Sequence, residues 1–181
     1  MDTQKLERFL KSFAGQVVKD AKENLIQAKG NTALGNSIRF EVTPDEQGFT
    51  TKFFMEDYGT YLDKGVSGNK KAVSYTNYYG NNQSSPYKYT TKGPPIDILS
   101  KWIKRKGIKP KGLGRGRSKD TGQYISGFAY LISKKIKREG IKSLSFFQIP
   151  LGIGLKEVKD KMLKELKLDI ETYLTTFYRP K

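Results

Sequence analysis

Apolar residues recur at intervals of three and four along the first thirty positions of the chain. This period predicts an amphipathic helix over residues 3–28, because residues three and four apart lie on one face of a helix. Gly30 and Asn31 are typical of a helix end. The apolar stripe indicates a face packed against a core or another subunit. It consists of Leu6, Phe9, Leu10, Phe13, Val17, Ala21 and Leu25.

Strict alternation replaces this pattern over residues 37–56. Ile38, Phe40 and Val42 alternate with polar residues, the turn sequence PDEQG follows, and a second alternating run comes after it. Period two on both sides of a Pro/Asp/Gly turn predicts a β-hairpin. A third short strand or a tight bend is expected at residues 58–62. One face of the second run carries Phe49, Thr51, Phe53 and Met55.

Three further helices are predicted. Pro94 and Pro95 open the second helix, since proline is tolerated in a first turn, the third covers residues 127–139, and the last covers residues 155–177. The fold class is therefore α+β: a small antiparallel sheet flanked by about four helices, in a single domain over residues 1–181. The apolar positions are Ile96, Leu99, Trp102 and Ile103, then Phe128, Leu131, Ile132 and Ile136, then Val158, Met162, Leu166, Ile170 and Tyr173.

Two similar phrases, KRKGIK at residues 104–109 and KREGIK at residues 137–142, finish the second and third predicted helices. Gly107 and Gly140 stand where a left-handed residue ends a helix in a Schellman cap. Basic residues in a last turn also complement the negative end of the helix dipole. The caps therefore explain Lys104, Arg105 and Lys106 without a ligand. The predicted hydrophobic pairs of the two caps are Ile103 with Ile108, and Ile136 with Ile141.

Residues 66–93 form an insertion rich in Tyr, Asn, Ser, Gly and Thr, with almost no aliphatic residue. Such a composition cannot build its own core, and it is typical of adaptable binding loops. One interpretation is a loop that orders against a neighbouring subunit, and the other is a floppy surface insertion. The candidate contact residues are Tyr75, Tyr78, Tyr79, Tyr87 and Tyr89.

Charge is distributed unevenly along the chain, whose formal net charge is +16. Residues 1–63 carry eight Lys/Arg against ten Asp/Glu, residues 64–142 carry nineteen against three, and residues 143–181 carry seven against five. The middle segment holds the whole excess. Such a field favours contact with a polyanion or an acidic partner, and general solubility is the plainer alternative.

The middle segment contains a predicted basic Gly/Arg loop over residues 109–122. It is not a phosphate-binding P-loop, because no Gly-Lys-Ser/Thr follows at the required spacing. It suits sequence-independent contact with phosphates or contact with an acidic protein surface, and the sequence leaves both open. The candidate contact residues are Lys109, Lys111, Arg115, Arg117 and Lys119.

The chain contains neither Cys nor His. This excludes thiol nucleophiles, disulfides and zinc ribbons, and it removes the commonest general base and transition-metal ligand. We therefore expect no enzymatic activity, no metal site and no cofactor. No run approaches the roughly 20 apolar residues of a membrane span, and the charged N-terminal run is not a signal peptide. Synthesis in the cytoplasm is the expectation.

The order of the elements and several short phrases resemble the neck or tail-completion proteins of tailed bacteriophages, in particular those of crAss-like phages. A Y-G-x-Y-x-x-x-G phrase follows the hairpin, and SPYKYTTKGPP, WIKRKGIKP and REGIKSLSFFQIPL belong to the same likeness. The likeness spans about residues 1–175, and the two polar loops depart from the family's simplest members. The motif residues are Tyr58, Gly59, Tyr61 and Gly65, then Phe146, Phe147 and Pro150.

The resemblance implies a structural virion protein of the head–tail connector, located in the neck or tail. Such proteins form closed rings, with six- or twelve-fold symmetry expected, that extend or seal the channel through which the genome passes. The implied partners are copies of the chain, the portal, adjacent neck and tail proteins, and non-specifically the genomic DNA, with no membrane. The alternative is a free, sequence-independent nucleic-acid-binding protein that uses the basic segment 104–119.

Overall fold

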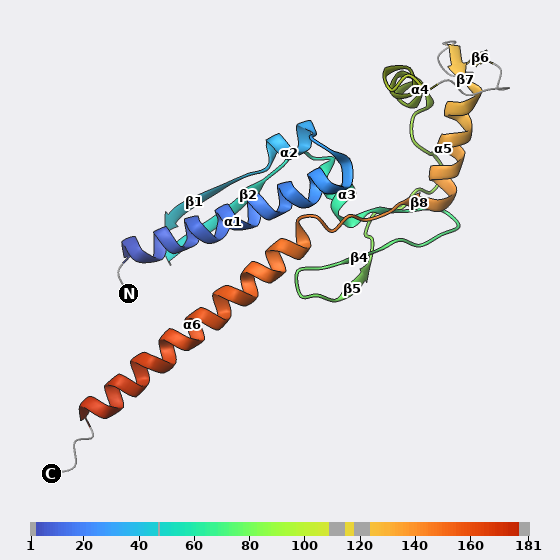
Figure 1. The fold of residues 1–181 in the computed structure, drawn as a ribbon. Helices are drawn as coiled ribbons and strands as arrows, with labels where there is room; N and C mark the ends of the chain where they lie inside the picture. Colours follow the sequence, from blue (N-terminus) through green and yellow to red (C-terminus); the bar gives the residue numbers. More distant parts are fainter. Residues whose placement is uncertain (1–2, 47, 109–114, 118–123, 178–181) are drawn as a thin grey trace. The chain divides into compact units, whose positions relative to one another are not determined.

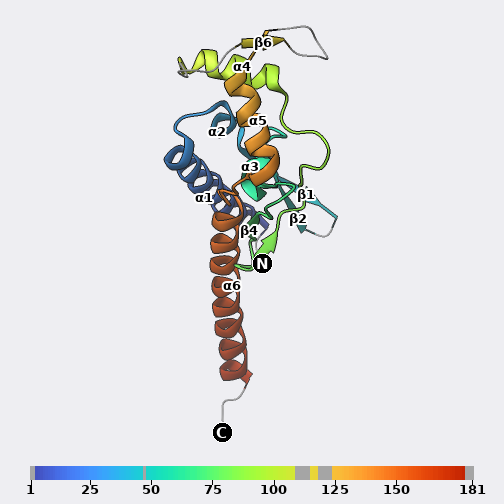
Figure 2. The same cartoon turned by 90° about the vertical axis from the view of Figure 1, so that its right-hand side faces the viewer.

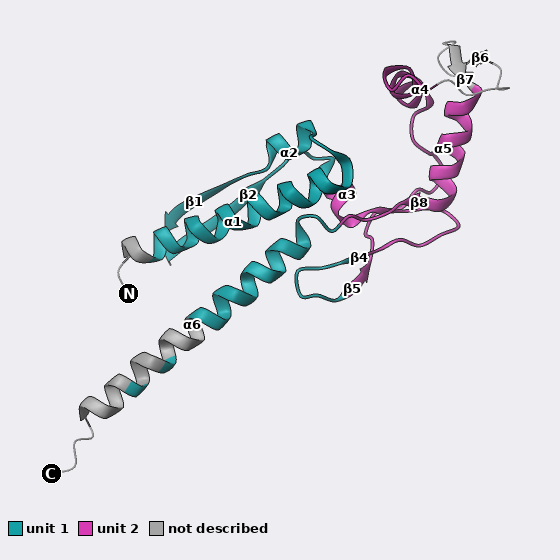
Figure 3. Ribbon diagram, viewed as in Figure 1, with its two compact units in different colours: residues 1–59, 76–81, 145–181 teal, residues 60–75, 82–144 magenta. Residues whose placement is uncertain are grey.

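The computed structural model describes residues 3–46, 48–108, 115–117 and 124–177 (Figure 1). This part of the chain contains six helices and four two-stranded sheets, so the predicted α+β class is confirmed. The sequence analysis expects one domain, whereas the structure groups the chain into two compact units (Figure 3). Unit 1 comprises residues 1–59, 76–81 and 145–181, and unit 2 comprises residues 60–75 and 82–144.

The first helix supplies the core of unit 1. Helix α1 spans Thr3–Lys29 and confirms the predicted helix. The centre of its apolar stripe is buried, with Val17 and Leu25 only 1% exposed. Phe147 packs edge-on against Phe53 in the same unit, with 5.3 Å between the ring centroids. Burying an aliphatic side chain such as Val17 or Leu25 contributes about 1.5–3 kcal/mol. The apolar stripe of α1 is therefore a main source of the unit's stability.

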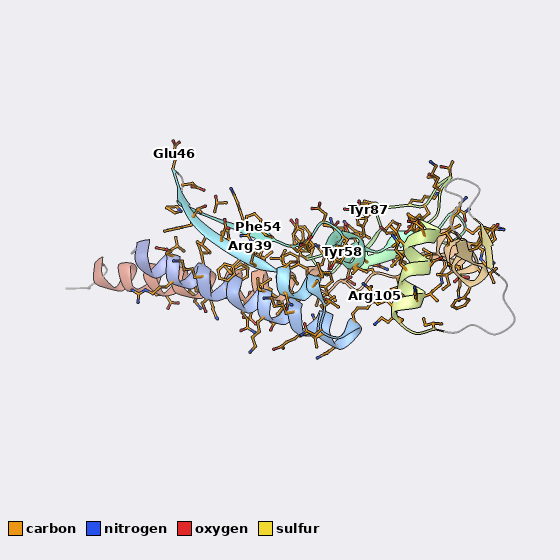
Figure 4. The ribbon with its side chains drawn as sticks, turned by 90° about the horizontal axis from the view of Figure 1, so that it is seen from above. Arg39, Glu46, Phe54, Tyr58, Tyr87 and Arg105 are labelled. Carbon is orange, nitrogen blue, oxygen red and sulfur yellow. The ribbon has the colours of Figure 1, made fainter. Side chains whose placement is uncertain are left out.

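The predicted hairpin is also confirmed. Strand β1 (Arg39–Asp45) pairs antiparallel with β2 (Gly48–Phe54). The register places Phe40 opposite Phe53, so the apolar positions of both strands share one face. On the other face the Arg39 guanidinium lies 4.3 Å from the centre of the Phe54 ring. Figure 4 shows this pair on the hairpin and Glu46 at its tip.

The last helix begins earlier than the sequence predicts. Helix α6 spans Gln148–Phe177, whereas the expected range is residues 155–177. Pro150 is accommodated because the first backbone N–H groups of a helix have no partner inside it. A Cβ on Gly152 would lie 2.4 Å from the carbonyl oxygen of Tyr78. Both residues disfavour a helix in the sequence. Pro150 is tolerated because of its position in the first turn, and Gly152 is required because of the close approach of Tyr78.

Two short helices differ from the sequence expectations. Helix α2 (Ala33–Ser37) was not predicted, and it follows Thr32, whose side-chain oxygen accepts a hydrogen bond from the Gly35 N–H at 3.3 Å. The strand or bend expected at residues 58–62 is wrong, because most of these residues lie in α3 (Gly59–Lys64). Tyr58 and Tyr61 are both exposed. Their spacing of three is a helical period and not an alternating one.

Unit 2 contains two of the predicted helices and three strand pairs. Helices α4 and α5 match the second and third predicted helices, and they pack beside each other (Figure 2). The sequence analysis predicts none of the three strand pairs. The elements are α4 (Ile96–Arg105), α5 (Gly127–Glu139), β3 (Val66–Ser67) with β8 (Gly140–Ile141), β4 (Ser74–Thr76) with β5 (Asn82–Ser84), and β6 (Arg115–Arg117) with β7 (Tyr124–Ser126).

The pairing of β3 with β8 brings distant segments into close approach. Val66 lies opposite Ile141, and Ser67 lies opposite Gly140. A Cβ on Gly140 would lie 2.2 Å from the carbonyl oxygen of Val66. A Cβ on Gly68 would lie equally close, 2.2 Å, to the carbonyl oxygen of Arg138. Side chains at these two glycines would therefore push the segments apart.

The cap predicted at the end of α4 is present. Gly107 has a φ of +65°, the left-handed conformation that glycine adopts most readily. The Ile108 N–H donates to the Ile103 carbonyl, and the Gly107 N–H donates to the Lys104 carbonyl, both at 3.1 Å. These are the two hydrogen bonds of a Schellman motif.

The cap at the end of α5 is only partly as predicted. Gly140 has a φ of +84°, as a left-handed terminator requires. However, Gly140 and Ile141 form β8, so Ile141 pairs with β3. The last carbonyls of α5 are instead bound from outside the helix. Asn69 N–H donates to the Lys137 carbonyl at 2.8 Å, and Lys70 N–H donates to the Arg138 carbonyl at 3.1 Å.

The Gly107 cap yields a stability prediction. We expect Gly107→Val to lower the free energy of unfolding by about 1 kcal/mol or more, because a β-branched residue is strained at positive φ. Gly107→Asn is the matched control and should retain most of the stability, since Asn tolerates this conformation. Urea unfolding followed by circular dichroism measures both. Equal midpoints for the two variants would contradict the cap.

Candidate nucleic-acid and partner interface

The two units differ in charge as well as in contacts. Unit 1 contains fifteen Lys/Arg and fourteen Asp/Glu, and unit 2 contains nineteen and four. Their formal charges are therefore +1 and +15. Among the acids of unit 2, Asp63 is 3% exposed, and a hydrogen bond from Arg138 at 2.7 Å holds the pKa of Glu139 below its usual value. The positive field of unit 2 is thus little compensated at its surface.

The basic residues predicted as contacts lie in and around β6. Lys109, Lys111 and Lys119 lie outside the described residues. Arg115 and Arg117 begin and end β6, opposite Ser126 and Tyr124 of β7. The sequence predicts a loop over residues 109–122, and the structure places the strand β6 within it. Its partner strand β7 packs against α4 and α5.

Further basic side chains are exposed on α4 and α5. These two helices carry seven Lys/Arg and two Asp/Glu. Asp97 lies in the first turn of α4, where a negative charge complements the helix dipole. The Lys134 ammonium lies 4.8 Å from the centre of the Tyr130 ring on α5. The exposed basic residues are Lys101, Lys104 and Arg105 on α4, and Lys134, Lys135 and Arg138 on α5.

The five candidate tyrosines divide between the units. Tyr78 and Tyr79 belong to unit 1, are 38% and 72% exposed, and have ring centroids 4.2 Å apart. Tyr75, Tyr87 and Tyr89 belong to unit 2 and are partly buried. Only the Tyr78–Tyr79 pair therefore presents the exposed aromatic surface expected of a contact loop.

The side chains of the three tyrosines of unit 2 are engaged inside the chain, two by direct contacts and Tyr89 by burial. The Tyr75 hydroxyl donates to Gln83 Oε1 at 3.1 Å. The Tyr87 ring packs edge-on against Tyr61, with centroids 4.5 Å apart. Burial raises the pKa of the Tyr89 hydroxyl above its usual value. These contacts give all three residues a structural role.

Backbone hydrogen bonds order the insertion in unit 2. Ser67 N–H donates to the Tyr87 carbonyl, and Tyr89 N–H donates to the Ser67 carbonyl, both at 2.8 Å. The Ser85 hydroxyl donates to the Gly65 carbonyl at 2.7 Å. These hydrogen bonds hold the insertion within the chain itself, in contrast to the alternative of a floppy surface insertion. The available sequence signal was its serine and asparagine content, because these side chains bind nearby backbone groups.

Asn77 organises the turn that carries Tyr78 and Tyr79. Its side chain is 95% buried, and its Oδ1 accepts hydrogen bonds from the Tyr79 N–H at 3.0 Å and the Asn81 N–H at 2.9 Å. Gly80 N–H donates to the Asn77 carbonyl at 2.9 Å. The tyrosines were expected from the sequence as contact residues, whereas Asn77, which holds their turn in place, was not.

The turn packs on the start of α6 and forms an exposed apolar surface with it. A groove of about 540 Å³ lies there, with Lys156 and Lys159 among its lining residues. We call this surface the α6 patch. An apolar surface of this kind is typical of a protein contact site. Its exposed members are Tyr78, Tyr79, Ile149, Ile153 and Leu155.

The described residues contain no cluster of three or more His, Cys, Asp or Glu that could hold a metal ion. Within the same residues, none of the helices has the length and hydropathy that a membrane crossing requires. Comparisons with protein-family models, curated proteins and solved structures find no match for this chain.

The Asn77 turn yields a second prediction. Asn77→Ala leaves two backbone N–H groups without their acceptor, which costs about 1–3 kcal/mol when such groups are buried. We expect faster hydrogen exchange at the amides of Tyr79 and Asn81, measured by mass spectrometry. Asn82→Ala, at an exposed position nearby, is the matched control. Unchanged exchange in Asn77→Ala would contradict the role of this side chain.

Proposed function

We propose that this chain is a structural subunit of the head–tail junction of a tailed phage, forming part of a neck or tail-completion ring around the DNA channel. The observation that carries the proposal is the division of the chain into a nearly neutral unit and a unit of charge +15. The resemblance of the sequence to neck and tail-completion proteins supplies the biological setting. The proposed role is assembly and not catalysis.

The charge of unit 2 suits a ring that faces an anionic partner. In a closed ring every copy presents the same surface, so the positive field repeats around the symmetry axis. Such a girdle attracts DNA in the channel or acidic surfaces on the portal and tail subunits. A subunit that served only as a spacer would not need fifteen net positive charges in one unit.

The α6 patch suits contact between copies of the chain. Unit 1 is close to electrically neutral, so two copies meet there without strong repulsion. Tyrosine and aliphatic side chains dominate the patch, and residues of these types are enriched at the buried centres of protein interfaces. We assign the Tyr78–Tyr79 turn to the contact between neighbouring subunits and the basic residues of unit 2 to the contact with other components.

A second candidate function is a free, sequence-independent nucleic-acid-binding protein. The exposed basic side chains of α4 and α5, together with the arginines of β6, favour it. Phosphate contacts of this kind do not require a ring. The two candidates differ in what the isolated chain does and in whether it belongs to the particle.

The first test is the copy number of the chain in purified, nuclease-treated phage particles. Quantitative mass spectrometry against the major capsid protein should give a low, fixed number of copies, compatible with one six- or twelve-fold ring. Nuclease treatment removes protein that only adheres to released DNA. Absence from the particle would overturn the structural role and favour the second candidate.

The second test is the salt dependence of DNA binding by the isolated chain. A free DNA-binding protein should lose affinity steeply, with a slope of log K against log salt of about −0.9 for each phosphate neutralised. If α5 contacts phosphates, Lys134→Gln/Lys135→Gln should reduce the magnitude of this slope by about 1 for each lysine in contact. Lys19→Gln/Lys29→Gln, exposed in unit 1, is the control. Equal slopes for both double variants would exclude Lys134 and Lys135 from the contact.

A further inference from the structure

A groove of about 590 Å³ lies between α4 and α5, within unit 2. Five of its seven lining residues are apolar: Ile98, Leu99 and Trp102 from α4, and Ile132 and Ile136 from α5. The sequence analysis assigned four of these five to the apolar sides of the two helices. The structure leaves part of that apolar surface open to solvent.

Two of the apolar residues that line the groove are exposed to solvent. Ile98 is 58% exposed and Trp102 is 37% exposed, whereas Ile103 on the same helix is 5% exposed. Helix α4 therefore packs on Ile103 and presents Ile98 and Trp102, one turn apart, to the groove. Single exposed apolar residues are ordinary, but adjacent ones in a concave site mark a contact surface.

The remaining lining residues are Lys101 and Arg105, both exposed. They lie one turn apart on α4, and Figure 4 shows Arg105 at the C-terminal end of that helix. The Schellman cap adds Lys104 and Lys106, also exposed, beside them. The groove thus combines an apolar floor with a basic rim.

We propose that this groove binds an amphipathic acidic helix of a partner protein. An apolar stripe would cover Ile98, Trp102 and Ile132, and the flanking carboxylates would face Lys101 and Arg105. A helix in a groove is a common mode of recognition, with apolar anchors at successive turns. The proposal names the class of partner for unit 2 within the proposed function, but it rests on this groove and not on the virion setting.

Charge complementarity selects a foreign partner over a second copy of this chain. Helix α1 carries six Lys/Arg against three Asp/Glu, and α6 carries five against five. Helices α4 and α5 are themselves strongly basic. None of these four helices carries a net negative charge over its full length, so a helix that is acidic throughout must come from another protein.

The floor of the groove argues against nucleic acid as the occupant. A nucleic-acid backbone needs polar and charged partners along its length. Here Trp102 is the only aromatic lining side chain on which a base could stack, and the rest of the floor is aliphatic. The basic rim could bind phosphates as well as carboxylates. The apolar floor therefore favours an acidic helix over nucleic acid as the occupant.

Trp102 is the only tryptophan of the chain, so its fluorescence reports on this groove directly. The probe is a synthetic 18-residue helix with Leu on one face, Glu on the others, and no aromatic residue. Its controls are the same peptide with Lys in place of Glu, and a peptide of the first composition with the Leu positions scrambled. We expect a saturable blue shift of Trp102 emission with the acidic peptide and an affinity that falls as salt is added. The Lys peptide should give no shift, and the scrambled peptide should bind at least tenfold more weakly.

A variant pair separates the groove from general charge attraction. Ile98→Asp places a carboxylate in the groove at an exposed position and should weaken binding of the acidic peptide at least tenfold. Ile26→Asp is the matched control, since Ile26 is 48% exposed on α1 in unit 1. It should bind as the unchanged chain does. Thermal unfolding of both variants is the control for a retained fold, and both should unfold cooperatively.

Three results would overturn the proposal: no shift with the acidic peptide, an equal shift with the Lys peptide, or equal affinity for Ile98→Asp and the unchanged chain. Quenching of Trp102 by single-stranded DNA, lost in Ile98→Asp and accompanied by no peptide response, would identify the groove as a nucleic-acid contact instead. These outcomes leave the copy number in particles unaffected. Failure of this inference is therefore distinguishable from failure of the proposed ring.

Discussion

The fold of unit 2 depends on the antiparallel pairing of β3 with β8. The pairing of Val66 and Ser67 with Ile141 and Gly140 joins segments that are far apart in the sequence, and it closes the long stretch of chain between them. The N–H groups of Asn69 and Lys70, just beyond β3, donate to the last carbonyls of α5. The segment that forms this strand pair therefore also caps a helix. Closing a long loop costs conformational entropy. Here several backbone hydrogen bonds formed at one place offset that cost.

This construction explains how a unit of charge +15 holds together with a small core. Of its described residues only Val66, Ile103 and Ala129 are buried hydrophobic ones, whereas unit 1 has nine. Polar contacts supply the rest, such as the Ser133 hydroxyl on the Pro94 carbonyl at 2.7 Å, each contributing about 1 kcal/mol. Because like charges repel one another, an anionic partner that bound this unit would also relieve its repulsion. Under the proposed function, partner binding and stability are therefore coupled in it.

The sequence predicted those features whose signals are local. Helix α1, the hairpin, α4, α5 and the Gly107 cap each follow from neighbouring residues, and the structure contains them all. The β3–β8 pair, the ordered insertion and the early start of α6 depend on contacts between distant segments, such as Gly152 against Tyr78. The basic excess and its place in residues 64–142 were evident from counting residues. That residues 76–81 group with the other unit was not, because it depends on contacts with distant residues such as Gly152.

The two candidate surfaces lie in units of different charge. The α6 patch is apolar within a unit of charge +1, which suits a partner with the same charge, including another copy of this chain. The groove around Trp102 is apolar within a unit of charge +15. A surface that only bound phosphates would not need an aliphatic floor, and a surface that only packed would not need a basic rim. A partner that satisfies both must itself be apolar and acidic. We therefore propose that the two surfaces differ in the charge of the partners they bind and use the same kind of hydrophobic contact.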